Sequence, residues 1–381
     1  MFRSVIVGVV LGSVTTLSTA ASLEEVVAEG LSANPEVSQA MNARNAVYQE
    51  IRQAQAGYLP KIDLAAGIGW EWTNNETTRA SGDDDDVRLT RQEASLSLRQ
   101  MLFDGFATSS EVDRQKARAI SADKRLVDVA ETFALDAAKA YVEVHRREQL
   151  MQLTKETLFN HVRIYDQIKR RSESGLGALA AIQQAEGRLA LAEVNALSAE
   201  NNLLDAKAAY VRVIGSDIPD HLSYPVEADA QHEPGTLQEA YEIARKNHPT
   251  LQLAEADTLA AQAQYRAAKR NYYPRVDLEV DRTWNNDIDG VDGTNEDLTA
   301  MLRLRYNLYN GGADKARVRQ TQHQISEAQS IQSKAHREVI QSIELSWNAH
   351  SILSRQIPYL EQLVVASQET VVSSKRRSIT G

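Results

Sequence analysis

Residues 275–284 read RVDLEVDRTW, and residues 298–305 read LTAMLRLR. In both segments, apolar and polar residues largely alternate along the chain. Because a period of two places successive side chains on opposite faces of a β-strand, each segment predicts a strand with one apolar and one charged face.

The same alternation occurs earlier, in residues 62–72 (IDLAAGIGWEW) and 93–102 (EASLSLRQML). Segments of about ten residues with this pattern are typical of membrane β-barrels, whose outer face contacts lipid and whose inner face is wet. We expect the following residues to face lipid: Leu64, Ile68, Trp70, Leu96, Leu98, Leu278, Leu302 and Leu304. We expect these residues to face a lumen: Asp63, Glu71, Glu93, Arg99, Asp277, Glu279, Arg303 and Arg305.

A soluble β-sandwich is the alternative, with the apolar faces covering a core. That alternative has to account for charges on the second face of all four segments and for the polar helices that adjoin them. In a membrane, four strands are too few, since known barrels begin at about eight. The protomer must therefore oligomerise, although the sequence does not give the number of copies.

The connections within the two strand pairs, residues 74–86 and 285–297, are acidic and predict long outer loops. Residues 287–293 (DIDGVDG) have some likeness to a calcium-binding loop. However, the third acidic position of such a loop is occupied by Val291 and the glycine is displaced, so a solvated loop is favoured.

The chain contains an internal duplication. Residues 23–35 (LEEVVAEGLSANP) match residues 237–249 (LQEAYEIARKNHP), and later landmarks match at nearly the same offset. We expect a first structural repeat over residues 22–215, a linker over 216–235 and a second repeat over 236–381. Gly381 aligns with Gly175, so the second repeat is expected to be truncated before its last helix.

Long helices should follow each strand pair. Residues 107–171 contain neither Gly nor Pro, and residues 313–377 contain only Pro358. At 1.5 Å per residue, 65 residues form a helix of roughly 97 Å, too long for an ordinary globular domain. Small and apolar residues recur every three or four positions, which favours coiled-coil-like bundling, and residues 178–213 offer an antiparallel partner.

Composition narrows the function further. Residues 1–21 have the basic start, apolar run and small residues of a signal peptide, and no later segment is apolar over about 18 residues. The chain has no Cys and a formal net charge of −10, which argue against thiolate chemistry and a nucleic-acid partner. No catalytic or metal-binding motif occurs, so we expect no enzyme activity and no cofactor.

Together these features resemble the TolC family of outer-membrane export channels. The resemblance rests on the tandem repeats, on Tyr-Leu-Pro 58–60 and Tyr-Tyr-Pro 272–274 before the strands, and on residues 102–105 (LFDG) and 308–312 (LYNGG) before the long helices. It implies a mixed α/β membrane protein that is internally duplicated: four strands per protomer join an outer-membrane β-barrel, and the long helices form a coiled-coil barrel in the periplasm.

The resemblance also implies partners. These are a homotrimer, outer-membrane lipid, a periplasmic adaptor (membrane fusion) protein, and an inner-membrane pump or the ABC exporter of a type I secretion system. A helix tip that contacts the adaptor would include Ser174, Gly175, Leu176 and Gly177, and Gly381 would begin the second tip.

Lys169, Arg170 and Arg171 lie at the same helix end and have two open interpretations. They could dock an acidic adaptor surface, or the helix dipole could stabilise cations at this C-terminus. For the whole chain, the alternative to a channel is a structural coiled-coil protein or adaptor of the envelope.

Overall fold

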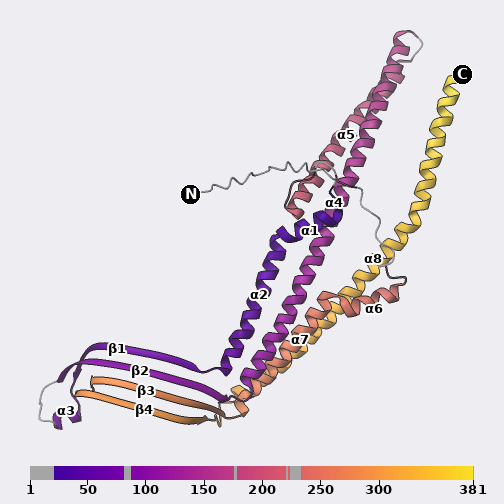
Figure 1. Ribbon diagram of the computed structural model, residues 1–381. Helices are drawn as coiled ribbons and strands as arrows, with labels where there is room; N and C mark the ends of the chain where they lie inside the picture. The colour runs from indigo at the N-terminus through magenta and orange to yellow at the C-terminus, as the bar shows by residue number, and fades with distance from the viewer. Residues whose placement is uncertain (1–20, 81–86, 176–177, 220–221, 224–232, 381) are drawn as a thin grey trace, which may run out of the picture. The chain divides into compact units, whose positions relative to one another are not determined.

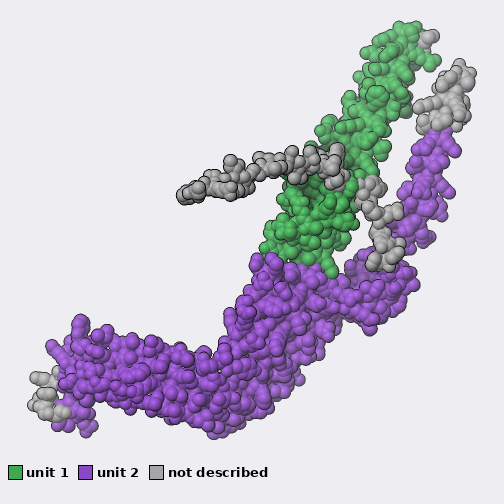
Figure 2. Space-filling view, in the orientation of Figure 1, with its two compact units in different colours: residues 1–39, 129–231 green, residues 40–128, 232–381 purple. Residues whose placement is uncertain are grey.

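The computed structural model describes residues 21–80, 87–175, 178–219, 222–223 and 233–380. The expected signal peptide lies outside these residues except for Ala21, and so do the tip residues Leu176, Gly177 and Gly381. The chain divides into two compact units (Figure 2). One comprises residues 1–39 and 129–231, and the other residues 40–128 and 232–381.

A four-stranded antiparallel sheet in the second unit is formed by two hairpins (Figure 1). The strands are β1 (Lys61–Thr73), β2 (Val87–Phe103), β3 (Arg275–Ile288) and β4 (Val291–Arg305), in the spatial order β1-β2-β3-β4. The two hairpins are about 170 residues apart along the chain, and β2 pairs with β3 to join them. All four alternating segments predicted from the sequence lie within these strands.

The connections inside the hairpins differ from the prediction. A short helix, α3 (Glu76–Ala80), follows β1, whereas β3 and β4 are separated only by Asp289 and Gly290. Both of these residues have positive φ angles, 56° and 78°, as a two-residue type I′ hairpin turn requires. The long loop predicted over residues 285–297 is therefore wrong: most of that segment is strand.

The helices before the sheet repeat the same construction in both halves. These are α1 (Leu23–Ala33) and α2 (Pro35–Gln55) in the first half, and α6 (Leu237–Asn247) and α7 (Pro249–Ala268) in the second. Each pair ends in a short 3-10 turn, η1 (Ala56–Tyr58) or η3 (Lys269–Tyr272).

Matching caps start these helices. The Ser22 hydroxyl accepts a hydrogen bond from the Glu25 amide, and Thr236 does the same for Glu239, which leaves fewer unpaired amides at each N-terminus. A proline then occupies the first position of α2 and of α7, where its missing N–H costs nothing.

Three helices account for most of the remaining length. They are α4 (Ala107–Glu173), α5 (Leu179–Ile214) and α8 (Ala313–Thr380). The 67 residues of α4 correspond to roughly 100 Å of helix. In the second unit, α7 packs along α8 (Figure 1). The predicted long helices and the antiparallel partner are thus present, and α8 continues through Pro358.

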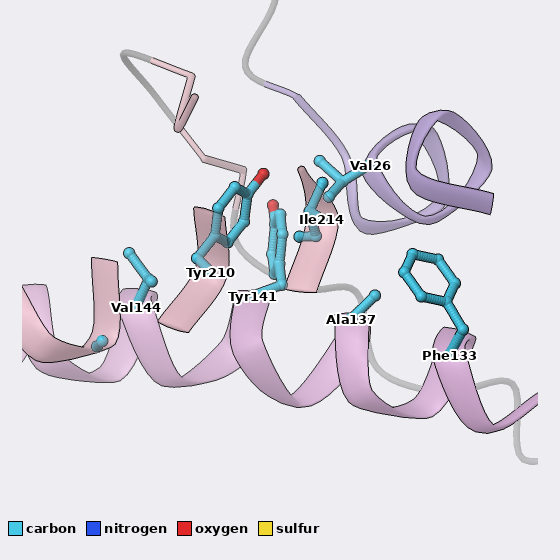
Figure 3. Close-up of a cluster of buried hydrophobic side chains, with 8 residues drawn as sticks. Val26, Phe133, Ala137, Tyr141, Val144, Tyr210 and Ile214 are labelled. Carbon is cyan, nitrogen blue, oxygen red and sulfur yellow. The ribbon is translucent and has the colours of Figure 1, made fainter. Parts of the chain in front are cut away.

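The core of the first unit lies where α1, α4 and α5 meet (Figure 3). Tyr141 and Tyr210 are fully buried there and pack with Ile214 and Val26. The Tyr141 hydroxyl lies 2.9 Å from the carbonyl oxygen of Ala21 and 2.6 Å from that of Ser223. This hydroxyl therefore lies within hydrogen-bond distance of backbone acceptors from two segments that are about 200 residues apart.

Candidate functional site: two faces of the sheet and a helix tip

The register of the sheet sorts the site residues predicted on the strands into two sets. Asp63 lies opposite Ser97, Ser97 opposite Asp281, and Asp281 opposite Thr299. Since residues opposite each other share a face, the odd-numbered residues of these rows form one face. All eight residues predicted to face a lumen have odd numbers, and all eight predicted to face lipid have even numbers.

Large apolar side chains cover much of the even-numbered face. Leu64 is 74% exposed, Trp70 82% and Leu302 68%, although these are side chains that folding normally buries. Leu96 and Leu98 continue this surface onto β2, and Leu278 onto β3. A contiguous apolar surface of this kind marks a lipid or protein contact.

One ion pair interrupts the even-numbered face. Arg282 on β3 pairs with Glu296 on β4 and stacks on the ring of Trp284, at 5.3 Å from the centroid. This pair is not predicted from the sequence, although Arg282 occupies a position where the alternation would place an apolar residue. Its acidic partner is 14 residues away, so only the register of the hairpin brings the two together.

Five of the predicted lumen residues form one cluster at the helix end of the odd-numbered face. Arg305 lies 2.8 Å from Asp277 and 2.6 Å from Glu279, while Arg303 lies 2.5 Å from Glu279. Arg99 reaches Glu279 from β2 at 3.3 Å. Arg275, which was not predicted, adds a further contact of 2.8 Å to Asp277.

The loop end of the odd-numbered face, next to the connections within the hairpins, has an excess of negative charge instead of positive charge. Arg91 lies 2.8 Å from both Glu71 and Glu93, and 3.6 Å from Asp289. Glu71 also accepts a hydrogen bond from the Gly290 amide of the β3–β4 turn, at 3.2 Å. Asp63 belongs to neither group, because its row lies between them.

A narrow turn joins each hairpin to its long helix. Gly105 and Phe106 both have positive φ angles, and so do their counterparts Gly311 and Gly312. Asp104 then caps α4, accepting hydrogen bonds from the amides of Ala107 and Thr108 at 3.0 and 2.8 Å. This turn fixes where the sheet ends and the helix begins.

The predicted helix tip lies at the end of α4. The Gly175 amide donates to the carbonyl of Ser172 at 2.9 Å, and Gly175 has a φ angle of 79°, a conformation that favours glycine. Ser174, Lys169, Arg170 and Arg171 are all exposed. The two interpretations of the basic residues therefore both stay open.

The part of the chain that the structure describes has no group of three or more His, Asp or Glu side chains placed to hold a metal ion. Within the same residues, none of the helices combines the length and the apolar character needed to cross a membrane.

Comparison with known proteins identifies the family. The model of the outer membrane efflux protein family matches residues 26–216 and 240–381, which is most of the chain. The chain belongs to this family. It is an outer-membrane channel protein of the efflux and secretion type with a periplasmic extension, and the family is one of transporters, not enzymes.

Relatives in several bacteria agree. Outer membrane protein TolC of Escherichia coli K12 is 25% identical over 382 residues, which cover 96% of this chain and 75% of that protein. Outer membrane efflux protein BepC of Brucella suis is 25% identical over 353 residues, covering 91% and 74%.

Solved structures share the fold. A membrane protein from Pseudomonas aeruginosa superposes with a TM-score of 0.83 at 19% identity, covering 95% of this chain and 84% of that one. For the outer membrane protein VceC of Vibrio cholerae, the TM-score is 0.79 at 16% identity, with 94% and 86% covered. The predicted fold class, four strands with long helices in two repeated halves, is confirmed.

Proposed function

We propose that three copies of this chain form one channel, each supplying four strands to a shared barrel of twelve. The main support is the sheet itself: among the residues that the structure describes, β1 and β4 each have a strand neighbour on one side only. Backbone groups without partners are costly in lipid, at several kcal/mol each, so both edges need strands from other copies. The even-numbered face would then contact lipid, and the odd-numbered face would line the lumen.

The long helices would extend this passage across the periplasm. In this arrangement, the channel is a passive conduit of a tripartite export system, for efflux or for type I secretion. Its partners would be a periplasmic adaptor protein and an inner-membrane pump or ABC exporter. Family membership supports this assignment, and the exposed tip of α4 would be the surface that contacts the adaptor.

The sequence divisions are part of the proposal. Residues 1–21 would be a signal peptide, and residues 22–215 and 236–381 two copies of one ancestral unit joined by residues 216–235. The matching caps at Ser22 and Thr236 and the paired glycine turns before α4 and α8 support the duplication.

The assembly can be tested on purified protein. In detergent, we expect native mass spectrometry to give the mass of three chains, each 42.2 kDa before any processing. In planar lipid bilayers, the same protein should produce stepwise increases in conductance. A monomeric protein without conductance would contradict the channel and leave a structural role in the envelope.

A second test concerns the helix tip. Replacing Gly175 and Leu176 together by serine should abolish export while the trimer still assembles and inserts. Assembly should be unaffected because the turn lies at the opposite end of α4 from the sheet. Export should be lost because a serine at position 175 must adopt the positive φ angle that side chains disfavour, at a cost of about 1–2 kcal/mol.

Gly187→Ala is the matched control for that test. Gly187 lies within α5, and an added Cβ there has no neighbour within 4 Å, so this variant should export normally. Export can be followed in cells as resistance to a toxic pump substrate. A variant that no longer exports should lose this resistance. Normal export by the tip variant would show that the turn does not serve the adaptor.

A further inference from the structure

The basic cluster at the helix end of the odd-numbered face exposes only one sign of charge. The side chain of Asp277 is fully buried and that of Glu279 is 7% exposed, whereas Arg99 and Arg275 remain 58% and 52% exposed. Arg303 and Arg305 are 43% and 46% exposed. The carboxylates are thus covered by the guanidinium groups that pair with them.

The pairing also leaves an excess of positive charge. Four guanidinium groups share two carboxylates, so the cluster itself has an excess of two positive charges per copy, although Asp104 also lies near enough to attract Arg275. Each guanidinium has five N–H donors, and one or two contacts to a carboxylate leave several of them for another acceptor.

A cavity adjoins the cluster. It has a volume of about 830 Å³ and lies between the end of the sheet and the start of the helices. Arg270, Arg275 and Arg305 line it, and so do two carboxylates, Asp104 and Glu111. Asp104 caps the start of α4, and Glu111 pairs with Arg114 at 2.6 Å, so both carboxylates already have partners. Arg270 extends from η3, and within the described residues no carboxylate pairs with it.

We propose that these five arginines form a binding site for anionic cargo in transit, which we call the basic collar. Its members are Arg99, Arg270, Arg275, Arg303 and Arg305. The collar rests on the proposed trimer for its place in the lumen, where it would be repeated three times around the passage. Its ligands would be solutes that carry several carboxylate, phosphate or sulfate groups, since guanidinium groups bind such oxyanions in a bidentate manner.

The loop end of the face would have the opposite effect. There, three carboxylates surround the single guanidinium of Arg91, so an anion would be attracted to the helix end and repelled at the other. A site of this kind would retain a polyanion at the base of the barrel without holding it at the outer mouth.

Binding of inorganic tripolyphosphate to the full-length protein in detergent tests the collar. Equilibrium dialysis at low salt should detect binding that disappears in about 1 M KCl, where the Debye length falls to about 3 Å. The double variant Arg99→Gln with Arg270→Gln should bind at least about tenfold more weakly than the wild type, because it loses two charge-assisted contacts per copy. Glu279 keeps two arginine partners in this variant, so the cluster stays paired.

Three further variants separate charge from structure. Arg99→Lys keeps the charge but loses the bidentate geometry, so it should bind more weakly than the wild type and more tightly than Arg99→Gln. Arg91→Gln removes a cation from the other end and should not weaken binding. Arg270→Gln alone removes a group that pairs with no carboxylate in the described chain. We therefore expect the Arg270→Gln protein to fold normally, and the substitution should still weaken the binding of tripolyphosphate measurably.

Two results would overturn the collar. One is that the wild type, the Arg270→Gln variant and the double variant all bind tripolyphosphate equally well. The other is an equal loss of binding in Arg91→Gln. Because dialysis requires no conductance, it decides on the collar even if the bilayer experiment were to reject the channel. In bilayers, the same probe should block the current of the wild type and block that of the double variant less.

Discussion

Leu302→Arg is expected to prevent stable insertion of the protein into the outer membrane. Leu302 lies on the even-numbered face of β4, opposite Leu278 on β3, and its side chain is 68% exposed. If this face contacts lipid, an arginine on it costs up to about 2–4 kcal/mol, the value at the middle of the bilayer, and a trimer carries the cost three times. Leu96→Arg on β2 should behave in the same way.

Ser97→Arg is the matched control, since it places the same side chain on the other face of the sheet. Ser97 lies between Asp63 on β1 and Asp281 on β3, so the new guanidinium would have two carboxylates within reach and stay wet. This variant should insert normally.

The measurement is the amount of heat-resistant oligomer in outer-membrane fractions. We expect wild-type amounts for Ser97→Arg and little or none for the two leucine variants. Equal loss in all three would mean that the assignment of the faces is wrong.

How well the strands could be predicted depended on how strictly their residues alternate. The first strand was placed to within one residue at either end, because residues 62–72 keep their apolar positions without a break. The return strand β2 begins at Val87, six residues before the predicted start. There Val87 and Leu89 are apolar on the odd-numbered face and Thr90 and Gln92 are polar on the even-numbered face, so the alternation has the opposite phase to that of residues 93–102.

The β3–β4 turn shows a different limit. Asp289-Gly290 is a strong signal for a two-residue hairpin, but it lies among so many Asn, Asp and Gly residues that composition indicated a loop. The pairing of β2 with β3 could not be predicted either, because the duplication gives two similar hairpins but says nothing of how they meet.

The sign of the charge that the candidate site exposes is a third feature that could not be predicted from the sequence. From the sequence, the inner face carries both signs, since Asp277 and Glu279 alternate with apolar residues while Arg303 and Arg305 do the same. Only the structure shows that the two carboxylates are buried beneath the guanidinium groups. Exposure depends on side-chain packing across three strands, which no linear pattern contains.

Gly105→Ala is expected to be the most damaging single change at the turn between the sheet and α4. Gly105 has a φ angle of 68°, where an alanine costs about 1–2 kcal/mol. In addition, the new Cβ would lie 2.5 Å from the backbone carbonyl oxygen of Arg270 and 3.0 Å from the Cβ of Tyr273.

Backbone atoms of η3 would have to move to relieve this clash, and overpacking of a close contact costs a further 1–3 kcal/mol, roughly. That movement would also disturb the ring of Tyr273, which meets Phe103 and Phe106 edge-on at 6.4 and 5.7 Å. We therefore expect a loss of about 2–5 kcal/mol in the free energy of unfolding.

Gly311→Ala separates the two contributions. Gly311 occupies the equivalent turn before α8 with a φ angle of 56°, but an added Cβ there has no neighbour within 4 Å. It should show only the backbone cost, about 1–2 kcal/mol. Thermal unfolding followed by circular dichroism, with hydrogen exchange over residues 265–275, measures both variants. Equal destabilisation by the two would mean that the close approach of Gly105 to η3 contributes nothing, and that the positive φ angle alone explains the glycine at this turn.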